Sequence, residues 1–335
     1  MKTLCLSVLA MLLAAPVAAQ PPVEAEISEK SAREDIFPQA EVAFPGDVVA
    51  SPQVEISNLD GFRPVRMDIY APRDRNKPRP AVLWIHGGGW SRGDARTSGA
   101  YANWPAVLAS LAARGFVVAS LDYRLSGEAR FPAQIQDVKA AIRHLRTHSG
   151  SLGIDPSRVY LWGGSAGGHL ASLAAVTCGV GEYDPQPSTG RLSRSQINAL
   201  KGTKAPPVDD CVQGAALWYG VFDLEHVPSV NVAGLLGCDP AACRDEARAA
   251  SPVYRIGKNV PPMLLIHGTK DETVDVSQSK AMAAALQAAG AKAELLLIPD
   301  VDHGLTGATP DVTRDASLLA LGRTFAFFES LAAGR

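Results

Sequence analysis

The chain has 335 residues, of which 47% are hydrophobic and 20% are charged. This composition excludes a disordered protein and supplies enough apolar surface for one large α/β domain or two smaller domains. With 32 Lys and Arg against 34 Asp and Glu, the formal net charge is −2. Because no basic run is present either, the sequence argues against nucleic acid and a membrane surface as partners. It does not predict an oligomeric state.

The N-terminal 19 residues have the organisation of a secretory signal peptide. Lys2 supplies a positive charge, residues 4–15 are apolar but too short to span a bilayer, and small residues precede a cleavage site after Ala19. A buried core helix is the alternative interpretation. We therefore predict a secreted or periplasmic protein, and we expect no later segment to be long and apolar enough to span a membrane.

Four cysteines remain once Cys5 is removed with the signal peptide. An even number in an exported protein indicates two disulfides, for which three connectivities exist. We favour a short loop closed by Cys238 and Cys243, and a second bond between Cys178 and Cys211; four unpaired thiols are the alternative. The spacings match no zinc site, and we expect no metal.

The chain beyond the signal peptide divides into an arm and one folded domain. Residues 20–45 are rich in Pro, Glu and Ala without periodicity, which predicts a flexible N-terminal arm. Residues 54–56 and 65–70 alternate between apolar and polar, as half-buried strands do. Five later runs are continuously apolar, which is typical of parallel strands buried on both faces: residues 81–85, 116–119, 159–162, 263–266 and 295–298.

Helical patterns lie between these runs. Residues 131–146 carry apolar side chains at spacings of three and four, and three further segments are also predicted to be helices: 166–177, 277–289 and 314–331. The order of elements predicts a mixed, mostly parallel sheet with helices on both faces, in a single α/β domain over residues 46–335. Residues 179–211 break the pattern and predict an insertion, which either covers a substrate or is decoration.

The strongest chemical signal is the run of residues 163–168, which fits G-x-S-x-G and stands between a predicted strand and a predicted helix. Such a turn holds Ser165 in a cramped backbone conformation and exposes its hydroxyl at a helix N-terminus, where developing negative charge is favoured. We predict Ser165 as a nucleophile. An ordinary Gly-rich turn is the alternative.

A second signal, residues 86–90, follows the strand at 81–85. Its glycines allow backbone N–H groups to converge on one point, as the oxyanion of an acyl-transfer reaction requires. We predict the N–H groups of Gly88, Gly89 and Ala166 as the donors. A phosphate site would need a P-loop lysine or G-x-G-x-x-G, and neither is present.

A serine nucleophile needs a base, and the base needs an acid that orients it. His303 and Asp271 each follow a predicted strand, at the sheet edge where Ser165 leaves its own strand. We predict His303 as the base and Asp271 as the acid. His267 is expected to support the Asp271 loop, and His226 to lie on the surface.

Three other carboxylates compete with Asp271 for the orienting role. Glu272 is adjacent but is expected to point elsewhere, and Asp302 is a sequence neighbour of His303, which rarely allows the two side chains to face each other. Asp223 follows the strand-like residues 214–219 and could reach the histidine in a variant layout.

With these residues in place, the sequence resembles α/β-hydrolases of the carboxylesterase type. It is close to the hormone-sensitive-lipase-like group and to bacterial feruloyl esterase and acetyl xylan esterase-like proteins. The segments that carry the resemblance are 86–90, 122–124, 131–137, 163–169, 267–271 and 302–304. One departure is Val274-Asp275, where such proteins often have Val-Pro. The resemblance implies a Ser-His-Asp acyl-enzyme mechanism without a cofactor, and scaffold roles for Arg124, Asp137 and His169.

Aromatic residues near the predicted site suggest a pocket wall. Trp90, Trp218, Tyr219 and Phe222 could bind a flat acyl group such as ferulate, and core packing is the alternative. The expected substrates are feruloyl or acetyl esters of plant polysaccharides. Two other function classes stay open: a prolyl-peptidase-like or formamidase-like enzyme with the same triad, and a non-catalytic binding protein on a hydrolase fold.

Overall fold

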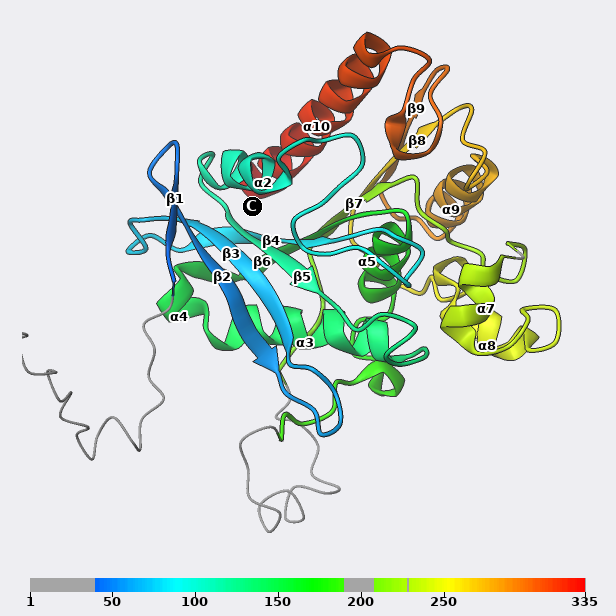
Figure 1. Cartoon of the computed structure of the whole chain (residues 1–335), viewed down its shortest axis with the longest axis horizontal. Coiled ribbons are helices and arrows are strands. Elements are labelled where there is room, and N and C mark those ends of the chain that lie inside the picture. Colours follow the sequence, from blue (N-terminus) through cyan, green and yellow to red (C-terminus); the bar gives the residue numbers. More distant parts are fainter. Residues whose placement is uncertain (1–39, 190–207, 228, 335) are drawn as a thin grey trace, which may run out of the picture. The chain divides into compact units, whose positions relative to one another are not determined.

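The computed structural model describes residues 40–189, 208–227 and 229–334 (Figure 1). The predicted signal peptide and most of the predicted arm lie outside these residues. Within them, nine strands form one sheet in the order β1-β2-β3-β5-β4-β6-β7-β8-β9. The strands are β1 Val42–Phe44, β2 Val48–Ser57, β3 Val65–Pro72, β4 Arg79–Ile85, β5 Val117–Asp122, β6 Ile154–Gly164, β7 Gly214–Trp218, β8 Met263–Gly268 and β9 Ala293–Ile298.

The sheet is mixed and mostly parallel, as the order of elements predicts. Strands β1, β2, β3 and β5 pair antiparallel. From β5 through β4, β6, β7 and β8 to β9, every neighbouring pair is parallel. The predicted site residues lie at or just after the carboxyl ends of five strands, β4, β6, β7, β8 and β9. Because these strands are parallel, their carboxyl ends meet at one edge of the sheet, where α/β proteins bind their ligands.

Helices cover both faces of the sheet (Figure 1). Helices α2 (Trp104–Ala112) and α10 (Pro310–Ala333) pack on one face, and α3 (Ala133–Thr147), α5 (Ala166–Val176) and α9 (Ser277–Ala288) pack on the other. The shorter helices are α4 Ser149–Leu152, α7 Val230–Leu236, α8 Arg244–Ala250, and the 3-10 turns η1 Gly181–Tyr183, η2 Pro252–Tyr254 and η3 His303–Leu305. Each sheet face thus has its own apolar core.

Two sequence expectations need correction. The flexible arm is predicted to extend to residue 45, but Val42–Phe44 already forms β1, which pairs antiparallel with β2. The expectation that no later segment could span a membrane is also wrong on length and composition. Helix α10 has 24 residues and meets both criteria. Its inward side chains, among them Ala320 and Phe328, are fully buried in the core of the domain, where a helix needs the same apolar character.

The two disulfides have the favoured connectivity, Cys178–Cys211 and Cys238–Cys243. The first joins the chain just after α5 to the segment just before β7, and so closes the predicted insertion at its base. Residues 190–207 of that insertion lie outside the described part of the chain, and its proposed covering role remains a prediction.

Ion pairs anchor the same base to α3. The fully buried Lys139 donates a hydrogen bond to the Thr177 carbonyl (2.6 Å) and pairs with Asp210 (3.3 Å). Arg143, one turn further along α3, pairs with both Asp210 and Asp184. These contacts hold both described ends of the insertion against one helix.

A tight turn between β6 and α5 positions the predicted nucleophile. Ser165 has φ 55° and ψ −122°, a conformation that few side-chain-bearing residues adopt. A Cβ added to Gly167 would overlap the carbonyl oxygen of Ile85 at the end of β4, and one added to Gly163 would overlap the carbonyl of Gly167. Both glycines are therefore required by close backbone contact, and Ser165 sits directly beside the segment that follows β4.

We predict that Gly167→Ala lowers the free energy of unfolding by about 1–3 kcal/mol, because the added methyl group must displace a backbone carbonyl. A matched control is Gly322→Ala in α10, where the new Cβ meets nothing within 4 Å. This control is expected to raise stability by about 0.5–1 kcal/mol. Urea denaturation of both variants tests the claim, which is contradicted if Gly167→Ala unfolds at the wild-type midpoint.

Candidate active site

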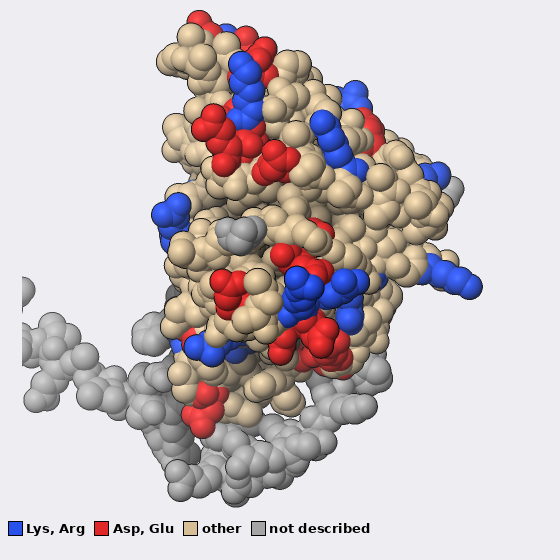
Figure 2. Space-filling view, turned by 90° about the vertical axis from the view of Figure 1, so that its right-hand side faces the viewer, with Lys and Arg blue, Asp and Glu red and all other residues tan. Residues whose placement is uncertain are grey.

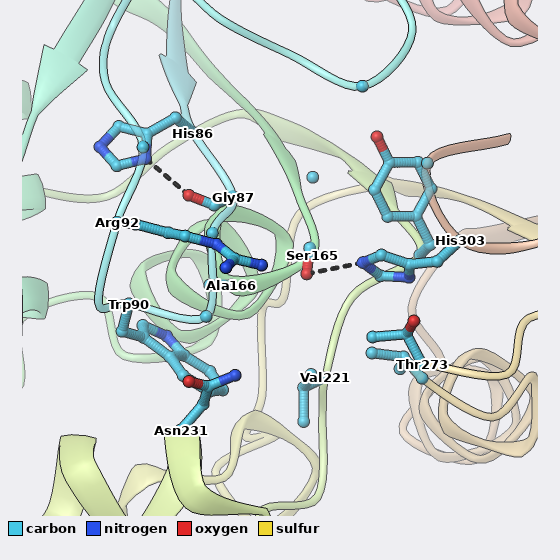
Figure 3. Close-up of a pocket in the computed structure, with 18 of the residues that line it drawn as sticks. His86, Gly87, Trp90, Arg92, Ser165, Ala166, Val221, Asn231, Thr273 and His303 are labelled. Atoms are coloured by element: carbon cyan, nitrogen blue, oxygen red, sulfur yellow. Dashed lines mark hydrogen bonds between the residues drawn. The ribbon is translucent and has the colours of Figure 1, made fainter. Parts of the chain in front are cut away.

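Three loops at the carboxyl edge of the sheet bring Ser165, His303 and Asp271 together. Ser165 follows β6, Asp271 follows β8, and His303 follows β9. His303 Nε2 lies 3.0 Å from Ser165 Oγ (Figure 3). On the other side of the ring, His303 Nδ1 lies 2.8 Å from Asp271 Oδ2. This is the hydrogen-bond chain from acid to base to hydroxyl that activates a serine nucleophile.

The Asp271 carboxylate is buried and fully hydrogen-bonded. Its Oδ1 accepts the backbone N–H groups of Thr273 (3.0 Å) and Val274 (2.7 Å), and its Oδ2 contacts His303 and, at 3.1 Å, His267 Nε2. Burial by itself raises the pKa of the carboxyl, but the hydrogen bonds from the two histidines and the backbone outweigh it and hold the pKa well below its usual value. Asp271 is therefore anionic at neutral pH.

His267 has the supporting position expected from the sequence. It is fully buried, with Nδ1 2.7 Å from Ser279 Oγ and Nε2 2.9 Å from the Val274 carbonyl oxygen. Through Val274 and Asp271 it braces the loop after β8. His226 lies on the surface, also as expected.

The competing carboxylates have other partners. Asp223 accepts hydrogen bonds from the His226 ring (2.8 Å) and the Tyr254 hydroxyl (2.9 Å). Asp302 accepts the backbone N–H of Glu272 and of His303, and does not bond to the imidazole ring. The geometry thus favours Asp271, whose carboxylate is the one bonded to His303 Nδ1 among the described residues.

Ser165 opens into a pocket of about 620 Å³. Gly88, Gly89 and Ala166, the predicted oxyanion donors, all line it. Ala166 lies next to Ser165 in Figure 3. Gly88 and Gly89 have φ angles of 106° and 60°, in the region that favours glycine. Neither N–H group donates to an acceptor in the described part of the chain, so both are available to an oxyanion.

Trp90 continues this turn and is held by a buried histidine. Its indole Nε1–H donates to His169 Nδ1 (3.0 Å), and His169 Nε2 lies 2.7 Å from the Ala250 carbonyl oxygen. These partners require a neutral His169 with its proton on Nε2, since Nδ1 must accept. Burial lowers the pKa of His169 to about 4, consistent with that state. The predicted scaffold role of His169 agrees with these contacts.

Of the other predicted wall residues, the structure places only Tyr219 in the pocket. Its ring packs edge-on against His303, with centroids 4.9 Å apart. The prediction for Trp218 is wrong: it lies on the face covered by α2 and α10, packs on Trp162, and donates its indole N–H to Thr324 (2.9 Å). Successive strand residues point to opposite faces, and Trp218 is the last residue of β7.

Phe222 was also expected near the pocket and does not line it. Its side chain is buried in the core under α5 and α9. Core packing, the alternative considered for these aromatic residues, therefore applies to Phe222 and Trp218.

Several pocket residues carried no sequence signal. They come from loops after β4, β7 and β8 and from the start of α7, where no motif marks them: Arg92, Ser98, Val221, Asn231 and Thr273. Only the general rule that ligand sites lie at the carboxyl edge of such a sheet could have pointed to these loops.

Arg124 and Asp137, the other two predicted scaffold residues, pair with each other inside the fold. Arg124 and Asp137 form a bidentate ion pair, with Arg124 Nη2 2.7 Å from Asp137 Oδ1 and Nε 2.9 Å from Oδ2. Both side chains are almost completely buried. They join the segment after β5 to the start of α3, and neither lines the pocket.

Two groups of possible metal ligands occur in the described residues. Asp223, Glu225 and His226 form one, and the disulfide-bonded Cys178 and Cys211 form the other with Asp209. Neither group lines the pocket around Ser165.

Comparisons with known proteins identify the family of this chain. The BD-FAE family model matches residues 67–286. The chain belongs to the BD-FAE family. It is an α/β-hydrolase of the carboxylesterase group, as the sequence resemblance implied.

The chain is 31% identical over 274 residues to Esterase LipC of Mycobacterium tuberculosis, covering 77% of this chain and 62% of LipC. It is 30% identical over 264 residues to a probable isoprenylcysteine alpha-carbonyl methylesterase of Arabidopsis thaliana, covering 76% and 51%. This chain thus spans less than two thirds of the length of these two relatives.

Two solved structures are matched over almost their whole length. A truncated carbohydrate esterase from gut microbiota superposes with a TM-score of 0.67 at 29% identity, covering 84% of this chain and 96% of that one. Thermogutta terrifontis esterase 2, phosphonylated by cyclosarin, superposes with a TM-score of 0.62 at 26% identity, covering 84% and 95%.

The neutral state of His169 predicts a pH dependence of stability. An unfolded histidine takes up a proton near pH 6.5, whereas folded His169 resists protonation down to about pH 4. The unfolded state therefore binds more protons in this window, and stability is lost as the pH falls through it. When the pH falls from 7.5 to 5, we expect the free energy of unfolding of wild type to drop by roughly 2 kcal/mol more than that of His169→Gln.

Urea denaturation at the two pH values measures this difference. The control is Ser110→Ala, which replaces an exposed side chain that does not titrate and should keep the wild-type dependence of stability on pH. An equal change in the free energy of unfolding between the two pH values for wild type and His169→Gln would contradict the account of His169.

Proposed function

We propose that this protein is a secreted serine esterase that hydrolyses carboxylic esters through an acyl-enzyme. Ser165 is the nucleophile, His303 the general base and acid, and Asp271 the residue that orients His303. The observation that carries the proposal is the hydrogen-bond chain through these three side chains, opening into a pocket with unpaired N–H groups at Gly88 and Gly89. The esterase names of the relatives support it.

Acylation begins as Ser165 Oγ attacks the ester carbonyl carbon and its proton passes to His303 Nε2. The carbonyl oxygen becomes an oxyanion and accepts the N–H groups of Gly88, Gly89 and Ala166. His303 then gives its proton to the departing alcohol oxygen as the C–O bond breaks, which leaves the acid part bound to Ser165. The anionic Asp271 stabilises the imidazolium form of His303 throughout.

Deacylation repeats the same steps with water. His303 removes a proton from water as the water oxygen attacks the acyl carbon, and the same N–H groups hold the second oxyanion. The bond to Ser165 breaks, and the proton on His303 returns to Oγ. The acid leaves, and the site is restored without any further co-reactant.

Feruloyl or acetyl esters of plant polysaccharides are the proposed substrates. The pocket of about 620 Å³ is large enough for a phenolic acid, and Trp90 and Tyr219 supply aromatic surface on two sides. The similarity to a carbohydrate esterase favours an ester attached to a sugar.

Export to the periplasm or the medium belongs to the same proposal. The sequence features of residues 1–19 support it, and so do the two disulfides, which persist in oxidising compartments. A polymer-linked substrate outside the cell would require such a location.

The test is the initial rate of ester hydrolysis by wild type, Ser165→Ala and a control, Ser110→Ala, which removes an exposed hydroxyl on α2. Substrates are p-nitrophenyl acetate, butyrate and decanoate, methyl ferulate, acetylated xylan and a p-nitroanilide peptide. Ser165→Ala should lose a factor of about 10³ or more in kcat, while Ser110→Ala keeps the wild-type rate.

Asp271→Asn should lower kcat about 10⁴-fold in the same assay, because the neutral amide no longer fixes the imidazole tautomer of His303.

Preference for methyl ferulate or acetylated xylan would support the proposed substrate class. A higher rate on the anilide would instead indicate a peptidase. Equal rates for wild type and Ser165→Ala on every substrate would overturn the mechanism and favour a binding protein.

A further inference from the structure

Arg92 brings a fixed positive charge to the wall of the catalytic pocket. It is exposed, and it follows the oxyanion turn by three residues. The other described residues that line the pocket are glycines, small polar or aliphatic residues, aromatic residues and two histidines. In this lining Arg92 is therefore the one side chain that is charged at every physiological pH.

The guanidinium group of Arg92 has no partner in the described ranges 40–189, 208–227 and 229–334. No carboxylate oxygen lies within 4.0 Å of it, and the side chain makes no hydrogen bond to a described residue. Neither neighbouring charge binds this guanidinium: Asp94 accepts the backbone N–H of Arg96, and the Arg96 side chain binds Asp68. All side-chain donors of Arg92 are thus free to bind a ligand.

The turn that presents the oxyanion donors also fixes the base of Arg92. The Arg92 backbone N–H donates to the Gly88 carbonyl (3.2 Å), and a Cβ built on Gly88 would lie 3.1 Å from Arg92 Cγ. In Figure 3 the side chain extends from the side of Gly87 toward Ala166 and Ser165. Asn231, whose amide makes no hydrogen bond to a described residue, lies on the same side, across from His303 and Thr273.

A local cation matters here because the chain has no net positive charge that would attract anions. The formal net charge is −2, and on the face shown in Figure 2 acidic and basic side chains are interspersed. A contact inside the pocket would therefore do more to hold an anionic substrate than the overall charge of the chain.

We propose that Arg92 is a specificity-determining residue that binds a free carboxylate on the ester substrate. This inference rests on the proposed esterase function and narrows its substrate class to esters whose acid or alcohol part carries a second, ionised carboxyl group, as in esters of acidic sugars. A planar guanidinium can bind both oxygens of a carboxylate, and the Asn231 amide offers a further donor on the same side of the pocket.

The test compares two pairs of esters that differ only in charge. Monoethyl succinate and ethyl succinamate vary the acid part, and 4-acetoxybenzoate and 4-acetoxybenzamide vary the alcohol part. For each pair, the ratio of kcat/KM for the anionic ester to that for the neutral one is measured in wild type, Arg92→Gln, Arg92→Lys and Lys258→Gln. The last variant removes one exposed positive charge outside the pocket.

We expect Arg92→Gln to lower this ratio about tenfold or more in at least one pair, as the loss of a charge-assisted contact implies. The pair affected shows which part of the ester Arg92 binds. Arg92→Lys should keep part of the preference, and Lys258→Gln should keep all of it. Unchanged ratios in Arg92→Gln for both pairs would overturn the proposal.

Failure of the underlying esterase function would look different. In that case wild type and Ser165→Ala would hydrolyse the neutral esters at the same rate, whatever residue stands at position 92.

Discussion

The close backbone contact between the Ser165 turn and the end of β4 is the constraint on which the site depends. Glycine at 167 lets the turn approach the Ile85 carbonyl, and glycine at 163 leaves room for the Gly167 carbonyl; a side chain at either position would collide. The same contact places the Ser165 hydroxyl beside the N–H groups of the turn that follows β4. The loops after β8 and β9 then need only present Asp271 and His303 at the same edge of the sheet.

The charges in the site are fixed before any substrate arrives. Hydrogen bonds keep Asp271 ionised in a buried position, and burial keeps His169 neutral beneath Trp90. His267 and His303 contact the same oxygen of Asp271, and among the described residues His303 is the imidazole that bonds to Ser165. Such preorganisation is the main way in which enzymes stabilise developing charge, because the dipoles need not reorient during the reaction.

Much of this could be predicted from sequence because parallel strands and the G-x-S-x-G turn leave strong local signals. Helix α2 could not be predicted in this way. Its nine residues are almost all apolar, so no 3.6-residue pattern separates a buried from an exposed side. Trp218 and Tyr219 are adjacent, but Trp218 ends β7 inside the core whereas Tyr219 begins the loop that lines the pocket, and composition could not tell which one reaches it. Arg92 and Asn231 become neighbours of the site only through the fold.

The central claim is that Ser165 is a nucleophile activated by His303, and covalent labelling tests it most directly. The intact protein would be treated with a fluorophosphonate, which reacts with activated serine hydroxyls, and the modified peptide would be located by mass spectrometry. The account predicts one adduct on Ser165, none in Ser165→Ala, and strongly slowed labelling in His303→Ala. An adduct on another residue, or undiminished labelling of Ser165→Ala, would contradict it.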